Sequence, residues 1–164
     1  MADVSSNGLQ KGRRVLVVDD DATIRLLCKR LLQDAGYAVL EAEGSPEAMA
    51  LLASGQEVDL IVADLFLPPP DFQLASAKSP YQRVNGHEMV PHMLAMKKTL
   101  RVLFMSSHSR ESLTAQHIRL GAAPFLQKPI SKEALLSQVE AALAAPALLF
   151  EAAATAKQDV RWVD

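Results

Sequence analysis

The chain has 164 residues, 49% of them hydrophobic, with a formal net charge of -2 and one cysteine. This length and composition favour one domain with a sizeable core. The small net charge gives no overall case for binding nucleic acid or a membrane surface. A single cysteine excludes an internal disulfide framework. Because no apolar signal core and no run long enough to span a membrane is present, we expect a cytoplasmic protein.

The first structured element is predicted at residues 14–18, an apolar run typical of a buried strand. Residues 1–12 before it show no periodicity and are expected to form a flexible leader. A helix follows, with Asp21 as its N-cap and Gly36 as its stop. Its apolar stripe includes Cys28, which favours a core residue over a reactive thiol. The basic residues Arg25, Lys29 and Arg30 lie elsewhere around this helix.

A weaker strand is predicted at 37–42, nearer a sheet edge. The next helix is expected to begin with a capping Ser45 and with Pro46 at its first helical position. A continuous apolar run then ends at Asp64 and is followed by three prolines, which predicts an inner strand with one carboxylate at its end.

The second half of the chain continues the alternation. A helix carrying Met89 and Met93 is expected to start late or to kink, because Pro91 is awkward beyond the first turn. Strands are predicted at 102–105 and 123–127, with a weakly anchored helix at about 109–120 between them. Ser131 is expected to cap the last helix. Five strands alternating with five helices predict an α/β fold with a parallel sheet and right-handed crossovers.

Polar groups stand at the ends of four of these strands: Asp19 and Asp20, Asp64, Ser106 and Lys128. Because neighbouring strand ends in a parallel sheet meet at one crevice, we expect these groups to lie together. Three carboxylates at one place repel unless a cation is present, and a small hard ion such as Mg²⁺ suits their oxygens. Carboxylates, Mg²⁺, a lysine and a hydroxyl suit a phosphoryl group. Each residue alone is better explained as a helix cap, turn or solvated side chain, but their coincidence at successive strand ends favours a site.

Four segments carry a family resemblance: Val-Leu-Val-Val-Asp-Asp-Asp at 15–21, Asp-Leu-Ile-Val-Ala-Asp-Leu-Phe-Leu-Pro at 59–68, Val-Leu-Phe-Met-Ser-Ser at 102–107 and Phe-Leu-Gln-Lys-Pro at 125–129. The chain resembles the receiver domain of bacterial two-component response regulators, over about 13–144. The resemblance implies a doubly wound, five-stranded (βα)5 sheet, flavodoxin-like, in a single domain.

The resemblance also implies residue roles. Asp64 would be the phosphoacceptor, and Mg²⁺ would be held by Asp19, Asp20, Asp64 and the backbone carbonyl of Phe66. Lys128 would pair with the phosphate, and its bond to Pro129 is similar to one that is commonly cis in the family. Ser106 and Phe125 take the positions of the family's switch residues, and a core role for Phe125 stays open. Phe66 and His108 lie at positions that tune phosphate lifetime in the family.

The sequence departs from the family pattern in the interval between Asp64 and Ser106, which is about a dozen residues longer than usual. The excess lies in an insert at about 69–84, interpreted as a mobile surface loop, with a role as a lid or kinase selector as the alternative. The tail at 145–164 is either a further amphipathic helix or a partly ordered end.

The resemblance implies a phosphorylatable switch that receives its phosphoryl group from a sensor histidine kinase or histidine phosphotransfer protein and then binds an output partner that the sequence does not identify. The switch would catalyse its own phosphorylation and dephosphorylation without turnover of a small molecule. No DNA-binding region is expected after Leu143, so the chain is read as a stand-alone regulator or relay, or as a receiver excised from a hybrid kinase. The alternatives are a phosphorylation-independent pseudo-receiver and, ranked last because Phe66 stands where a second acid is needed, an aspartate-nucleophile phosphatase of the haloacid dehalogenase type.

Overall fold

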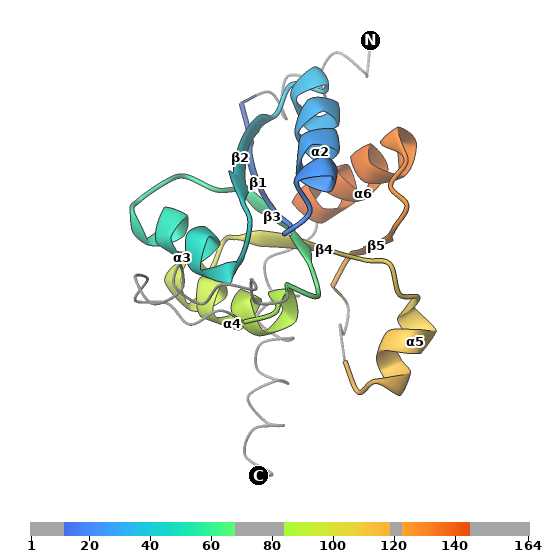
Figure 1. The fold of residues 1–164 in the computed structure, drawn as a ribbon. Coiled ribbons are helices and arrows are strands. Elements are labelled where there is room, and N and C mark those ends of the chain that lie inside the picture. The colour runs from blue at the N-terminus through green and yellow to red at the C-terminus, as the bar shows by residue number, and fades with distance from the viewer. Residues whose placement is uncertain (1–11, 68–83, 119–122, 145–164) are drawn as a thin grey trace.

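Five parallel strands form one sheet with helices on both faces (Figure 1). The structure is a computed structural model that describes residues 12–67, 84–118 and 123–144. The strands are β1 (Arg14–Val18), β2 (Ala38–Ala42), β3 (Leu60–Asp64), β4 (Arg101–Ser106) and β5 (Phe125–Gln127), in the spatial order β2-β1-β3-β4-β5. The helices are α2 (Ala22–Asp34), α3 (Ser45–Ala53), α4 (Gly86–Met96), α5 (Arg110–Ala115) and α6 (Lys132–Ala144). The predicted doubly wound, flavodoxin-like fold is confirmed, with β2 at an edge.

The central strands are buried on both sides because their residues alternate between two apolar clusters. Leu16 and Val18 belong to the cluster that includes residues of α3 and α4. Val15 and Val17 belong to the cluster that includes residues of α2 and α6. The sheet is therefore the middle of three layers, which explains why β1 and β3 are almost continuously apolar in the sequence.

Two predicted helix caps are confirmed. The Asp21 carboxylate accepts hydrogen bonds from the Thr23 amide at 2.8 Å and the Ile24 amide at 3.4 Å, so it satisfies two free amides in the first turn of α2. The Ser131 hydroxyl accepts from the Ala134 amide at 3.2 Å at the start of α6. In both cases the cap and its partner lie within three residues, so local sequence decides the interaction.

The predicted cap of α3 is wrong. Gly44 is the N-cap, and Ser45 is already the first helical residue. The Ser45 hydroxyl is fully buried and instead accepts a hydrogen bond of 2.7 Å from the amide of Val84. The Ser45 hydroxyl therefore bonds to a residue distant in the sequence and does not cap the helix.

Two other helices differ from expectation. α4 begins at Gly86, directly after its N-cap Asn85, so Pro91 lies in the second turn and the helix does not start late. α5 ends at Ala115, well before the predicted end at 120, and His117 has a left-handed backbone with φ of 64°. Leu113 is the one buried residue of α5, so little packing energy supports a longer helix.

The expected leader, insert and tail lie outside the described residues, apart from Gly12 and Val84. The two described ends that flank residues 68–83 are each fixed by a side chain. The Asn85 side chain accepts from the Leu67 amide at 2.9 Å, and the Ser45 hydroxyl accepts from the Val84 amide. We call these four residues the neck.

Candidate functional site

The carboxyl ends of β1 and β3 bring three carboxylates together. Val18 pairs with Ala63 in the parallel register, so the residues that follow them, Asp19 and Asp64, emerge side by side. One carboxylate oxygen from each of Asp19, Asp20 and Asp64 lies within 4.8 Å of the others. Asp19 is fully buried, Asp64 is 8% exposed, and Asp20 faces solvent. The predicted acidic group is thus assembled at the point where the helices after β1 and β3 lie on opposite faces of the sheet.

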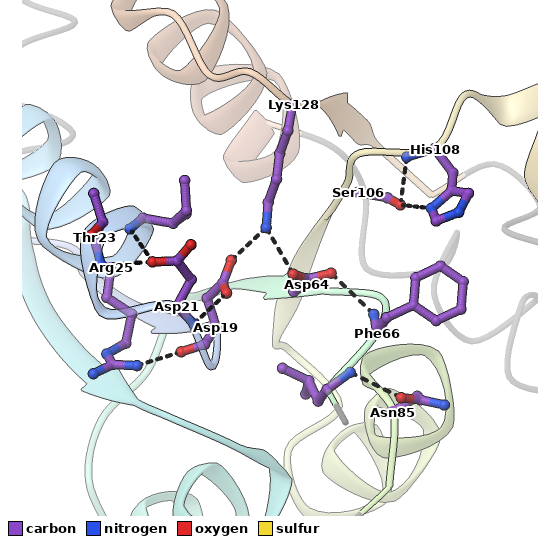
Figure 2. Close-up of polar contacts among 12 residues, drawn as sticks. Asp19, Asp21, Thr23, Arg25, Asp64, Phe66, Asn85, Ser106, His108 and Lys128 are labelled. Atoms are coloured by element: carbon purple, nitrogen blue, oxygen red, sulfur yellow. Dashed lines mark hydrogen bonds and ion pairs between the residues drawn. The ribbon is translucent and has the colours of Figure 1, made fainter. Parts of the chain in front are cut away.

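Lys128 joins this group from the far end of the chain. Its ammonium lies 2.7 Å from Oδ2 of Asp19 and 2.7 Å from Oδ2 of Asp64 (Figure 2). The residue follows β5 directly, and its backbone amide donates to the Ser106 carbonyl at 2.8 Å, which continues the β4–β5 pairing beyond the strand. The Lys128–Pro129 peptide bond is cis. One flexible cation therefore neutralises two buried carboxylates.

The electrostatics of the group reflect burial and mutual repulsion. Burial raises the pKa of Asp64, and the Asp19 charge adds to this, whereas hydrogen bonds from Lys128 and the Phe66 amide act in the opposite direction. Burial and the Asp19 charge also raise the pKa of Asp20. Burial alone would lower the pKa of Lys128, but its hydrogen bonds and charge attraction with Asp19 and Asp64 outweigh burial and raise it. The site thus favours a bound cation, and a further positive charge would relieve the carboxylates.

Besides the Lys128 contact at its Oδ2, Asp19 is held by β2, by the loop after β1 and by α2. Its amide donates to the Ala42 carbonyl at 3.2 Å, and its carboxylate Oδ1 accepts from the Asp21 amide at 2.9 Å. Its carbonyl oxygen accepts from Nη1 of Arg25 at 2.6 Å. Arg25 lies away from the apolar stripe of α2, and its position in the sequence did not predict this contact.

Phe66 follows Asp64 closely and borders the site. Its amide donates to Oδ1 of Asp64 at 3.0 Å, which orients the carboxylate. Its ring packs against two imidazoles, with ring centroids 5.1 Å from His108 and 6.5 Å from His87. His87 was not singled out in the sequence, since its position after Asn85-Gly86 carries no motif. It reaches Phe66 because α4 begins directly beneath the end of β3.

Ser106 is buried at the end of β4, and its hydroxyl is engaged locally. The hydroxyl oxygen accepts from the His108 amide at 3.0 Å and lies 3.5 Å from Nδ1 of the same histidine. Ser106 therefore lies on the strand beside Asp64, while its hydroxyl is bonded within the β4–α5 loop (Figure 2).

Phe125, at the start of β5, is partly buried against the cluster beneath α4. The Arg110 guanidinium lies 5.3 Å from the centre of its ring, and the same side chain donates to the Ala123 carbonyl at 3.0 Å. The ring is thus covered by a cation, an arrangement typical of cation–π attraction.

The donor set fits a small, hard divalent cation. Asp19, Asp20 and Asp64 offer carboxylate oxygens alone, which is the ligand type preferred by Mg²⁺. Carboxylates and an ammonium within reach of one another can bind a phosphoryl group, and a desolvated aspartate can act as its acceptor.

These features define a doubly wound α/β protein with an acidic site at its topological switch point. A model of the response regulator receiver domain matches residues 15–140. The chain belongs to this family, the receiver domains of two-component systems, which confirms the resemblance drawn from the sequence.

Known relatives agree with this assignment. The response regulator SaeR of Staphylococcus aureus (strain NCTC 8325 / PS 47) is 26% identical over 125 residues, which cover 76% of this chain and 48% of SaeR. The chain therefore spans about half the length of the curated relatives it matches. The chemotaxis protein CheY4 of Vibrio cholerae superposes with a TM-score of 0.63 at 27% identity, covering 80% of this chain and 98% of CheY4. A response regulator receiver protein from Sinorhizobium medicae WSM419 has a TM-score of 0.65 at 21% identity, covering 82% and 96%, and shows likeness of fold.

None of the described helices combines the length and apolar character needed to cross a membrane.

Proposed function

We propose that this receiver is a phosphorylatable switch in which Asp64 accepts a phosphoryl group from a phosphohistidine. The observation that carries the proposal is the Lys128 ammonium, which lies 2.7 Å from both Asp19 and Asp64, beside the third carboxylate of Asp20. A phosphoryl group carries negative charge on several oxygens, and this arrangement supplies an acceptor together with the cations that such a group needs.

The acceptor step follows from the position of Asp64. Its carboxylate attacks the phosphorus, an O–P bond forms as the N–P bond of the donor breaks, and the imidazole leaves with the electron pair. The Phe66 amide holds the carboxylate at 3.0 Å during this step. Lys128 exchanges its bond to Asp64 for one to a phosphoryl oxygen, because its ammonium carries several donors on a flexible stem.

Asp19, Asp20, Asp64 and the backbone carbonyl of Phe66 are the groups proposed to hold Mg²⁺. The bound ion would neutralise charge that develops on the transferred phosphoryl oxygens. Burial and the Asp19 charge raise the pKa of Asp64 and that of Asp20, so a cation bound here would stabilise their charged forms.

Ser106 and Phe125 are proposed as the switch. A phosphoryl group on Asp64 would compete for the Ser106 hydroxyl, which now accepts from the His108 amide at 3.0 Å. Movement of Ser106 would open space for Phe125, and the ring would leave the Arg110 guanidinium above it. The surface around β5 would then bind an output partner differently, which is a two-state response to a local charge.

The proposed donor is a sensor histidine kinase or histidine phosphotransfer protein in the cytoplasm. Residues 13–144 are proposed to form the complete receiver unit, with the insert at about 69–84 inside it. Direct binding of nucleic acid forms no part of the proposal.

The test is the intact mass of the protein after incubation with acetyl phosphate and Mg²⁺. Wild type should gain one phosphoryl group, and Asp64→Ala, or wild type with chelator, should gain none. Asp59→Ala is a matched control, because Asp59 precedes the same strand and its carboxylate accepts from the Arg14 amide at 2.8 Å, outside the acidic group.

The outcomes separate the alternatives. No adduct on wild type, either from acetyl phosphate or from a phosphohistidine protein, would favour the pseudo-receiver. Steady release of phosphate from a small phosphate ester would favour a hydrolase, whereas the receiver predicts one phosphoryl group per chain.

A further inference from the structure

We infer that Arg25 is a positioning residue for cation binding, because its guanidinium fixes the main chain of Asp19 beside the acidic group. The inference rests on the proposed function, since it concerns the same Mg²⁺ site. It assigns a role to a residue that supplies no ligand atom to the acidic group.

The contact joins α2 to the end of β1. Nη1 of Arg25 donates to the Asp19 carbonyl oxygen at 2.6 Å, and Nε of the same side chain lies 3.7 Å from Oε1 of Glu41 on β2 (Figure 2 draws the first contact). The Arg25 side chain is 17% exposed, so most of its length is packed. The guanidinium therefore bridges a backbone carbonyl of the site and a carboxylate of the edge strand.

The hydrogen bonds of Asp19 fall into two groups: those of its carboxylate, which would bind the cation, and those of its main chain, which would not. Its Oδ2 faces Lys128, and its Oδ1 accepts from the Asp21 amide. Carboxylate contacts such as these are open to exchange when an ion arrives. The main-chain bonds to Ala42 and to Arg25 use no carboxylate oxygen, so an ion can bind the carboxylate without breaking them. They set the orientation from which the carboxylate must reach the ion.

Arginine suits this role because its planar fork can bind two acceptors at once. Glu41 anchors one side of the fork, and Lys29 holds the other oxygen of Glu41 at 3.1 Å. A lysine at position 25 would keep the positive charge and one donor nitrogen, but it lacks the planar group that binds two acceptors at once.

The charge of Arg25 and its positioning role predict opposite changes in cation affinity when Arg25 is removed. By Coulomb attraction alone, removal of a positive charge close to three carboxylates strengthens the binding of a cation. If Arg25 positions Asp19, its removal weakens cation binding because the carboxylate is no longer held in place. The direction of the change therefore decides between the two roles.

The measurement is the affinity for Mg²⁺ by isothermal titration calorimetry, for wild type, Arg25→Ala, Arg25→Lys and Lys29→Ala. We expect Arg25→Ala to bind about tenfold more weakly, the range found for residues that orient metal ligands. Arg25→Lys should recover part of the loss. Lys29→Ala is the matched control, because it removes the same charge and a contact to Glu41 but leaves the Asp19 carbonyl bonded, so its affinity should be unchanged or slightly higher.

A second readout needs no ion. Amide hydrogen exchange of the metal-free protein reports the bond from the Asp21 amide to Asp19 Oδ1, which depends on the orientation of Asp19. Arg25→Ala should raise exchange at Asp21 while the amides of β3 keep their protection, whereas Lys29→Ala should leave Asp21 unchanged.

The outcomes are distinguishable. Wild type that binds no Mg²⁺ would contradict the proposed cation site itself. Wild type that binds Mg²⁺, with Arg25→Ala equal to or tighter than Lys29→Ala, would overturn the role of Arg25. If Arg25→Ala fails to fold, Glu41→Gln releases the anchor while leaving Arg25 in place, and it should show a smaller loss of the same sign, with no change again overturning the role.

Discussion

Gly86, the first residue of α4, lies directly against the carbonyl oxygen of Asp64. A β-carbon built on Gly86 would overlap that oxygen and would stand 3.0 Å from the carbonyl carbon. The Gly86 amide also donates to the Leu65 carbonyl at 3.0 Å. The start of α4 is therefore seated on the strand end that presents the proposed phosphoacceptor.

Gly86→Ala should destabilise the protein by about 2 kcal/mol, because both overlapping groups are backbone and neither can swing away. This loss exceeds the roughly 1 kcal/mol by which alanine favours a helix over glycine. Urea unfolding measures the change, and the rate of labelling by acetyl phosphate should fall with it. Gly55→Ala is the control: Gly55 has a φ of +90° but open space around it, so that variant should lose stability and keep its labelling rate. Equal labelling by all three proteins would contradict the prediction.

Ser45→Ala should cost about 2 kcal/mol, because it leaves the Val84 amide facing a buried site without its acceptor. The wild-type bond is 2.7 Å long and the hydroxyl is fully buried. Ser54→Ala removes an exposed hydroxyl that donates to the Leu51 carbonyl and should change stability by less than about 0.5 kcal/mol. Similar unfolding free energies for the two variants would argue against a structural role of Ser45.

Lys128→Met should destabilise the metal-free protein by about 3 kcal/mol at neutral pH, because two buried carboxylates lose their shared cation. Added Mg²⁺ should restore part of the loss. The difference from wild type should shrink as the pH falls toward 3.8, since Asp64 and Asp20, whose pKa is raised, take up protons early. At the other extreme, the pKa of Lys128 is raised above 10.5, so the stability that its charge contributes is complete below 10.5 and declines as the pH rises through the raised value.

Lys97→Met is the control for this prediction, because Lys97 pairs at 3.4 Å with the exposed Glu57. Exposed pairs contribute about 0.5 kcal/mol or less. Thermal unfolding with and without Mg²⁺ measures both variants. A loss for Lys128→Met no larger than that of Lys97→Met would show that the bridge adds little.

Cys28 should resist alkylation in the native protein. Burial raises the pKa of its thiol from 9.0 to about 11, and the Asp19 charge adds to the shift. Iodoacetamide at pH 8 should therefore label the native chain slowly and the urea-unfolded chain quickly. Between pH 9 and 11 the native state holds the proton that the unfolded state releases, so this group makes stability fall as the pH rises. Mass spectrometry after timed quenching measures labelling, and rapid native labelling would contradict the burial of the thiol.

Features decided by local pattern could be predicted from the sequence. The apolar runs of β1 and β3 indicated inner strands, and the Asp21 cap depends on residues two and three positions away. Because a parallel sheet aligns its strand ends, the acidic group followed from the strand assignment alone. The same reasoning placed Lys128 at the site, although it stands 109 residues from Asp19.

Contacts that depend on packing between distant segments could not be predicted. Ser45 has the residue type and the position of a helix cap, but its partner Val84 is 39 residues away. Arg25 has the pattern of a solvent-facing residue, and its bond to the Asp19 carbonyl depends on how α2 turns back over β1. His87 carries no motif and meets Phe66 because Gly86 lets α4 approach so closely.

The neck bears on whether residues can be inserted between Leu67 and Val84. Because Asn85 and Ser45 hold Leu67 and Val84 in place, the ends of the intervening segment are joined to the domain whatever lies between them. For an inserted flexible peptide, each doubling of its length adds only about 0.6 kcal/mol of closure entropy. The interval between Leu67 and Val84 is therefore a suitable insertion point, at which a reporter or a foreign binding peptide can be placed next to Asp64 without redesign of the sheet.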